Sequence, residues 1–99
     1  MPDAHFNALT PAEHERLSLL VEECGEVLQV AGKVLRHGYE SKHPDGGPTN
    51  RDLLAMEIGD VQTAIRLLSK AADVSQAKID ERLRAKPAKL ARYLHHAAV

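Results

Sequence analysis

The sequence predicts an all-α protein, built from an antiparallel helical hairpin with further helices at its C-terminal end. Apolar residues recur at spacings of three and four, and no run shows the period of two that is typical of strands. One segment rich in glycine and proline, residues 38–49, separates the two long helical patterns. The chain has 99 residues, enough for one small domain, which we expect to span 1–99.

The first helix is predicted by its start signal. Residues 1–9 show no periodic pattern and are expected to form a loose arm. The stretch Thr10-Pro11-Ala12-Glu13 combines a capping side chain, a proline in the first turn and an acid three residues after the cap. We expect this helix to continue to Arg36 or His37, with Gly38 ending it.

The second helix follows the loop over residues 38–49. Four glycine or proline residues within the second half of that loop oppose regular structure. Thr49 or Asn50 is suited to cap a helix, because a short polar side chain can accept a hydrogen bond from the first turn. The apolar period that starts there predicts a helix to about Ala72.

The C-terminal part is expected to form two short helices. Ser75 is a suitable cap for the first of them. We expect a break before Pro87, because the residue that precedes a proline is pushed away from helical geometry. A short terminal helix is then expected within residues 87–99, ending at about His96.

The first helix has one apolar face, which also bears on assembly. Its members are Leu17, Leu20, Val21, Cys24, Val27, Leu28, Ala31, Val34 and Leu35. Two helices of so short a chain cannot close a core alone, since small domains bury little of their surface. We therefore expect a homodimer or homotetramer, in which helices of two subunits complete a four-helix bundle. Cys24 is expected to be a small buried residue.

Composition and charge exclude several classes of function. The chain carries 13 basic and 14 acidic residues and only three aromatic rings, so we expect no nucleic-acid partner. No apolar run approaches the roughly 18–20 residues of a membrane span, and no secretory signal is seen, so we expect no membrane partner and a cytoplasmic protein. A single cysteine excludes an internal disulfide and a cysteine-based zinc cluster. After residue 74, six basic residues stand against two acidic ones, which suits a compact anion or a solvated helix face.

Two acidic clusters carry the strongest functional signal. On the second helix, Glu57 and Asp60 fall within the apolar face, where a bare carboxylate is costly. On the first helix, Glu23 and Glu26 are three residues apart, so their side chains lie on neighbouring turns. Antiparallel packing of the two helices would bring these four carboxylates together. Oxygen-only ligation favours Mg²⁺, with Mn²⁺ as a substitute. The alternative is a set of surface acids paired with Lys and Arg, which stays open above all for Glu22.

The two clusters also resemble a known family. Glu-Glu-x-x-Glu at residues 22–26 and Glu-x-x-Asp at residues 57–60 resemble the paired motifs of the MazG-like all-α nucleoside triphosphate pyrophosphohydrolases. The resemblance covers about residues 10–72, with a spacer between the motifs at the long end of the family's range. It implies that Glu23, Glu26, Glu57 and Asp60 hold Mg²⁺, with Glu22 as a supporting neighbour and Glu22 and Glu23 in the catalytic set.

The same resemblance implies a reaction. A nucleoside triphosphate, with a deoxynucleotide favoured, would be hydrolysed to the monophosphate and pyrophosphate by attack of water on the α-phosphorus. Basic side chains would then contact the phosphates. Lys33 and Arg36 lie on the polar side of the first helix, below Glu26, with His37 next to them. Lys78 and Lys86 match a later family element only loosely.

Other functions remain open at this point. A phosphoribosyl-ATP pyrophosphatase would carry similar acid motifs, and an inactive helical interaction module would keep the fold. A carboxylate-bridged di-iron bundle is disfavoured, because the clusters lack Glu-x-x-His pairs. Glu40-x-x-His43 has that spacing but lies in the loop, which could also act as a lid or base-recognition element. His95-His96 is a weak metal motif in a tail that we expect to be solvated.

Overall fold

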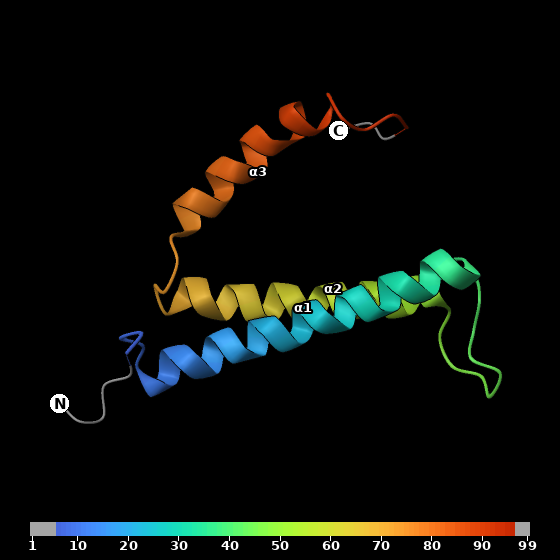
Figure 1. The fold of residues 1–99 in the computed structure, drawn as a ribbon, viewed down its shortest axis with the longest axis horizontal. Helices are drawn as coiled ribbons and strands as arrows, with labels where there is room; N and C mark the ends of the chain where they lie inside the picture. The colour runs from blue at the N-terminus through green and yellow to red at the C-terminus, as the bar shows by residue number, and fades with distance from the viewer. Residues whose placement is uncertain (1–5, 97–99) are drawn as a thin grey trace.

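The structure, a computed structural model, describes residues 6–96 and is all-helical over that part of the chain, as predicted (Figure 1). The elements are α1 (Pro11–His37), α2 (Asn50–Lys70) and α3 (Gln76–Leu90). Helices α1 and α2 lie side by side and antiparallel, with the loop over residues 38–49 at one end of the pair. Residues 6–9 of the expected arm form a turn and irregular chain, while residues 1–5 lie outside the described residues.

Helix α1 begins and ends where its capping residues predict. The Thr10 hydroxyl accepts a hydrogen bond from the Glu13 amide at 3.1 Å, and the Glu13 carboxylate accepts one from the Thr10 amide at 2.8 Å. This reciprocal pair satisfies two amide groups that the first helical turn leaves free. Gly38 ends the helix with φ = 88°, a conformation that favours glycine, and its amide donates to the Val34 carbonyl.

Helix α2 is capped by Thr49, as predicted, and ends at Lys70, two residues earlier than expected. The early end follows from Ala72, whose φ of 63° breaks the right-handed path of the helix. The segment after it is tied back to α1. Arg16 donates two hydrogen bonds to Asp73, from Nε at 2.5 Å and from a terminal nitrogen at 2.9 Å. This bidentate pair lowers the pKa of the Asp73 carboxyl from its ordinary value.

Helix α3 corrects two predictions about the C-terminal part. It begins after the Ser75 cap as expected, but it continues through Pro87 instead of breaking before it. The separate helix expected within residues 87–99 is therefore wrong over the described residues, since Ala91–His96 form turns and bends. A proline removes one amide donor, and three residues of α3 remain after it. The missing bond concerns the carbonyl of Leu83, an exposed residue whose backbone water can reach.

The core of the described chain is small and lies between α1 and α2. Only Val30, Ala64 and Leu68 are buried apolar residues within residues 6–96. On the other edge of the predicted α1 face, large apolar side chains are exposed within residues 6–96; these are Leu17, Val21, Leu28 and Leu35, with Leu35 88% exposed. Cys24 belongs to this outer edge and is exposed, so its predicted burial is wrong for the single chain. The side of α1 that packs against α2 is rotated about the helix axis relative to the predicted apolar face, and it includes the buried Val30.

Helix α3 stands away from the hairpin, as Figure 1 shows. It follows the hairpin through a short connection after Lys70, near the end where Arg16 and Asp73 meet. None of the helices within residues 6–96 is both long enough and apolar enough to cross a membrane. Because α3 stands away, the acidic residues are positioned by the hairpin of α1 and α2.

Candidate metal centre

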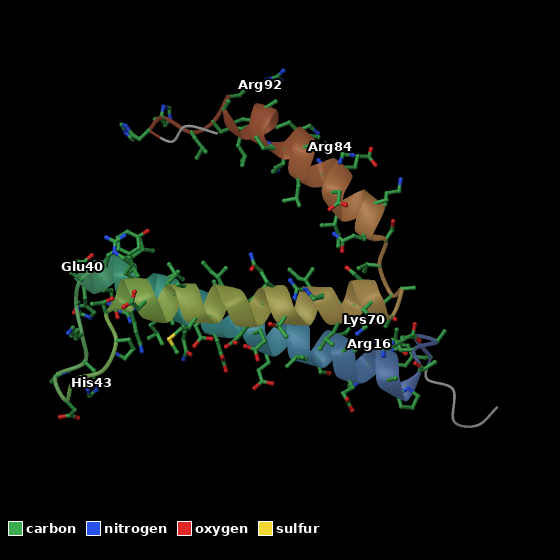
Figure 2. The ribbon with its side chains drawn as sticks, turned by 180° about the vertical axis from the view of Figure 1, so that it is seen from behind. Arg16, Glu40, His43, Lys70, Arg84 and Arg92 are labelled. Atoms are coloured by element: carbon green, nitrogen blue, oxygen red, sulfur yellow. The ribbon has the colours of Figure 1, made fainter. Side chains whose placement is uncertain are left out.

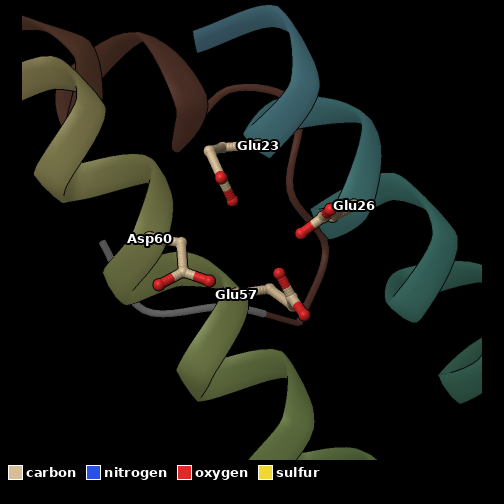
Figure 3. A group of neighbouring side chains, drawn as sticks. All are labelled: Glu23, Glu26, Glu57 and Asp60. Carbon is tan, nitrogen blue, oxygen red and sulfur yellow. The ribbon is translucent and has the colours of Figure 1, made fainter. Parts of the chain in front are cut away.

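Four carboxylates meet between the two helices of the hairpin. Glu23 and Glu26 on α1 face Glu57 and Asp60 on α2, as Figure 3 shows. One oxygen from each of the four side chains can be chosen so that all four atoms lie within 4.8 Å of one another. A spacing of three residues places each pair on adjacent turns, and the antiparallel arrangement turns the two pairs toward each other. The structure thus brings together the four residues that the sequence singled out.

Two oxygen atoms of this cluster are covered. Glu23, Glu26 and Glu57 are half-buried, while Asp60 is exposed. Oε2 of Glu23 and Oε2 of Glu57 are inaccessible and accept no hydrogen bond from any described residue. Buried polar atoms are nearly always hydrogen-bonded, so two such acceptors in one cluster call for an explanation.

No basic side chain of the described residues, 6–96, pairs with the four carboxylates. The ion pairs within residues 6–96 are Arg16–Asp73, Arg51–Glu40 and His43–Asp45, none of which includes a cluster residue. The alternative of acids paired with Lys and Arg is therefore not what the structure shows for these four. Glu22 lies outside the cluster and is exposed, although it is close enough for its charge to act on Glu23.

The crowding raises the pKa of two cluster carboxyls. The pKa of Glu57 rises above its ordinary value, first because it can share a proton with the Glu26 carboxylate, then through burial and the negative charges of Glu26, Asp60 and Glu23. The pKa of Glu23 rises chiefly through burial, and then through the charges of Glu26, Asp60 and Glu22. Like charges and desolvation both disfavour the ionised form, so the cluster without a cation is electrostatically strained.

This strain predicts a pH dependence for the metal-free protein. Because the pKa values of Glu23 and Glu57 are higher in the folded chain than their ordinary 4.5, the folded state holds more protons just above that pH. Stability then falls as the pH rises through this range. We expect the melting temperature of metal-free protein to increase from about pH 7 to about pH 5. The Asp73 shift acts in the opposite direction but only near and below its ordinary 3.8, outside this window.

The matched comparison is Glu57→Gln, which removes one charge from the cluster and keeps the side-chain shape. Thermal melts across the same pH range should show a flatter profile for this variant than for wild type. The two proteins differ at this one residue, so the difference between their profiles isolates the cluster. Parallel profiles for the two proteins would contradict the proposed origin of the pH dependence.

The donor set fits a hard divalent cation. Mg²⁺ binds oxygen at about 2.0–2.1 Å in octahedral geometry, which places ligand oxygens about 3–4 Å apart. Four oxygens within 4.8 Å of one another need only small adjustments to reach that spacing. The cluster contains no nitrogen or sulfur ligand, and a cation would satisfy the covered atoms of Glu23 and Glu57.

The predicted basic contacts divide into two groups. Lys33 and Arg36 line a pocket between the end of α1 and the loop over residues 38–49. Lys78 and Lys86 line a shallow apolar groove along α3, which stands away from the hairpin, so a single chain does not bring them to the carboxylates. The sequence reading missed Lys42 as a pocket residue, although its position among loop glycines and prolines, close after the last turn of α1, was a usable signal.

The remaining metal motifs do not assemble in the described chain. Glu40 accepts a hydrogen bond from Arg51 at 2.8 Å, and His43 Nδ1 accepts one from the Asp45 amide at 3.1 Å. His95 and His96 lie with their rings tilted, 6.3 Å between centroids. Within residues 6–96, the group of side chains able to hold a metal ion is the carboxylate cluster.

Comparison with known proteins adds no relative: no family model, curated protein or solved structure matches the chain significantly. The function is therefore inferred from the residues and geometry of the hairpin.

Proposed function

We propose that the protein is a Mg²⁺-dependent nucleoside triphosphate pyrophosphohydrolase. The observation that carries the proposal is the cluster of four carboxylates between α1 and α2, with two covered oxygen atoms and no basic partner within residues 6–96. A cation would compensate the charges of this cluster, and the reactions that such cations serve include phosphate-ester and anhydride hydrolysis. The order and spacing of the acids resemble the motifs of the MazG-like enzymes. Among the hydrolytic reactions, this resemblance favours pyrophosphohydrolysis of a nucleoside triphosphate.

Each residue has a role in this proposal. Glu23, Glu26, Glu57 and Asp60 would hold the cation. When bound, the cation supplies positive charge to the phosphoryl oxygens and makes a nearby water more acidic. Asp60, the exposed member, leaves the cluster open on the side from which a nucleotide would arrive. Glu22 would act through its negative charge, which raises the pKa of the neighbouring Glu23 carboxyl.

The unpartnered outer edge of α1 supports a homodimer. Large apolar side chains there are far more exposed than those facing α2, with Val21 at 71% and Leu28 at 73%. Burial of apolar surface is the main favourable term in association. In this proposal α1 of each subunit packs on its partner, and the two hairpins form a four-helix bundle.

A substrate screen tests the proposed reaction. Metal-free protein is supplied with Mg²⁺ and each of the eight common nucleoside and deoxynucleoside triphosphates, and pyrophosphate and monophosphate are measured together. We expect equal amounts of both products from at least one deoxynucleotide. Turnover of phosphoribosyl-ATP with no release from any deoxynucleotide would replace the proposal by its nearest alternative. Orthophosphate as the product would contradict attack at the α-phosphorus.

A thermal-shift measurement separates the enzyme from an inactive helical module. A ligand at about 100 times its Kd adds about 2.7 kcal/mol to the stability of the state that binds it. For a domain of this size, we expect Mg²⁺ or Mn²⁺ to raise the melting temperature by roughly 10–20 °C. Glu57→Gln should lose most of the shift, and Glu15→Gln, an exposed acid of α1 outside the cluster, should keep it. Equal melting temperatures with and without either ion would favour the module.

A further inference from the structure

A second pocket lies at the closed end of the hairpin, between the last turns of α1 and the loop over residues 38–49. Its volume is about 520 Å³. Basic side chains from both elements line it, among them Lys33 and Arg36 from α1 and Lys42 from the loop. His37 and His43 add two more nitrogen-bearing rings to the wall. Figure 2 shows this end of the molecule, with Glu40 and His43 labelled.

The pocket keeps its positive charge. Lys33, Arg36 and Lys42 form no ion pair with any residue in the range 6–96. Of the loop acids, Glu40 pairs with Arg51, while Asp45 pairs with His43, a residue of the pocket wall. The dipole of α1 favours basic residues in its last turn, which accounts for Arg36. It does not account for Lys42, which comes from another element.

The loop that forms one wall is held in place by several contacts. The Asn50 side chain donates to the Gly38 carbonyl at 3.1 Å, and the Asn50 and Arg51 amides donate to the Ser41 and Tyr39 carbonyls at 2.9 Å. Arg51 also lies over the Tyr39 ring, 4.5 Å from its centroid. Lys42 pairs with Thr49 in an antiparallel bridge. The pocket is thus built into the fold before any ligand arrives.

Lys33, a residue of the pocket wall, lies on the same side of α1 as Glu26. Lys33 follows Glu26 by seven residues, which in an α-helix returns the side chain to within about 20° of the same direction. The rise between them is about 10 Å. Helical side chains lean toward the N-terminus of their helix, so the Lys33 ammonium is carried from its own turn toward the carboxylates. An anion that extends from the carboxylates toward the pocket would therefore approach the Lys33 ammonium first.

We propose that this pocket binds the pyrophosphate end of the nucleotide, the group that leaves in the reaction. This inference rests on the proposed function and names the residues that hold the leaving group. Phosphate oxygens need several donors of positive charge, and Lys33, Arg36 and Lys42 supply them. The pocket has no Phe, Tyr or Trp ring in its wall, and its basic side chains suit an anion. The β- and γ-phosphates lie here while the α-phosphate stays at the carboxylate cluster.

Direct binding of inorganic pyrophosphate tests the pocket without any reaction. Calorimetric titration is done on the full chain, freed of metal by chelating resin, so that the carboxylate cluster cannot contribute through a cation. We expect wild type to bind and Lys33→Ala and Lys42→Ala each to bind at least about tenfold more weakly, since hydrogen bonds to charged groups are lost. Lys33→Arg should retain binding. Lys70→Ala, at the far end of the hairpin in Figure 2, is the matched control and should bind as wild type.

Two further measurements separate this inference from the proposed function. Glu57→Gln should bind pyrophosphate as wild type does, because it changes only the carboxylate cluster. In the Mg²⁺-dependent reaction, Lys33→Ala should weaken inhibition by added pyrophosphate by the same factor as in the titration. Equal binding by Lys33→Ala and Lys70→Ala would overturn the pocket. Binding that depends on Lys33, in a protein that hydrolyses no nucleotide, would overturn the assignment to a leaving group and leave only an anion site.

Discussion

Replacement of Glu57 by Gln is expected to abolish nucleotide hydrolysis while leaving the helical fold intact. Glu57 has a covered oxygen, and its carboxyl interacts with those of the other three cluster residues, most strongly with Glu26. The amide keeps the size of the side chain but loses the charge that ligates a cation. Loss of a carboxylate from a catalytic metal site removes both affinity and orientation, so we expect pyrophosphate release to fall by at least about 10²-fold.

The decisive comparison uses Asp60→Asn and Glu15→Gln beside Glu57→Gln. Asp60→Asn should also abolish release, whereas Glu15→Gln, on an exposed turn of α1, should leave it unchanged. Circular dichroism shows whether each variant keeps its helices. The metal-free Glu57→Gln protein should be no less stable than wild type near neutral pH, because the substitution relieves crowding of like charges. Full turnover in both cluster variants would end the assignment of the site.

The second large effect is expected at the outer edge of α1. Leu28→Lys should convert the proposed dimer to monomer, because it places a charge in the middle of the apolar surface between the subunits. Leu28 is 73% exposed in the single chain, so the substitution disturbs little within it. In a two-fold symmetric interface each substitution counts twice. With about 1.5 kcal/mol for each buried leucine, the dimer dissociation constant should rise by at least about 10²-fold.

Light scattering on size-separated protein measures this change. Leu83→Lys on α3 is the matched control, since Leu83 is exposed to a similar degree, 67%. We expect wild type and Leu83→Lys to be dimers or tetramers at micromolar concentration and Leu28→Lys to be a monomer with a lower melting temperature. A small core with three buried apolar residues in the described chain makes that loss of stability large. A monomeric wild type would contradict the proposed assembly.

Much of the fold could be predicted because the signals were local. The capping box of α1, the glycine that ends it and the Thr49 cap of α2 each depend on residues within one turn. The continuation of α3 through Pro87 could not be predicted in this way. The bias of the residue before a proline opposes the helix locally, yet the turns that precede Pro87 carry α3 through it for three more residues. Local preference is a weak guide where neighbouring turns already fix the backbone.

The candidate site was predictable for a related reason. A spacing of three within each acid pair and one reversal of chain direction are sufficient to bring four carboxylates together. The exposure of Cys24 was not predictable. Periodicity defines the apolar face of α1, but it does not define which part of that face the neighbouring helix α2 covers. The basic pocket at the closed end depends on the path of the loop, which hydrogen bonds from Asn50 and Arg51 determine. Such long-range contacts leave no periodic trace in the sequence.

The proposed function depends on a cation being held by four carboxylates. Titration of Mn²⁺ into metal-free protein, followed by electron paramagnetic resonance, measures that binding directly and needs no substrate. We predict saturable binding by wild type, loss of that binding in Glu57→Gln and Asp60→Asn, and retention in Glu15→Gln. Free Mn²⁺ signals that are identical with and without wild-type protein would contradict the metal centre and, with it, the proposed function.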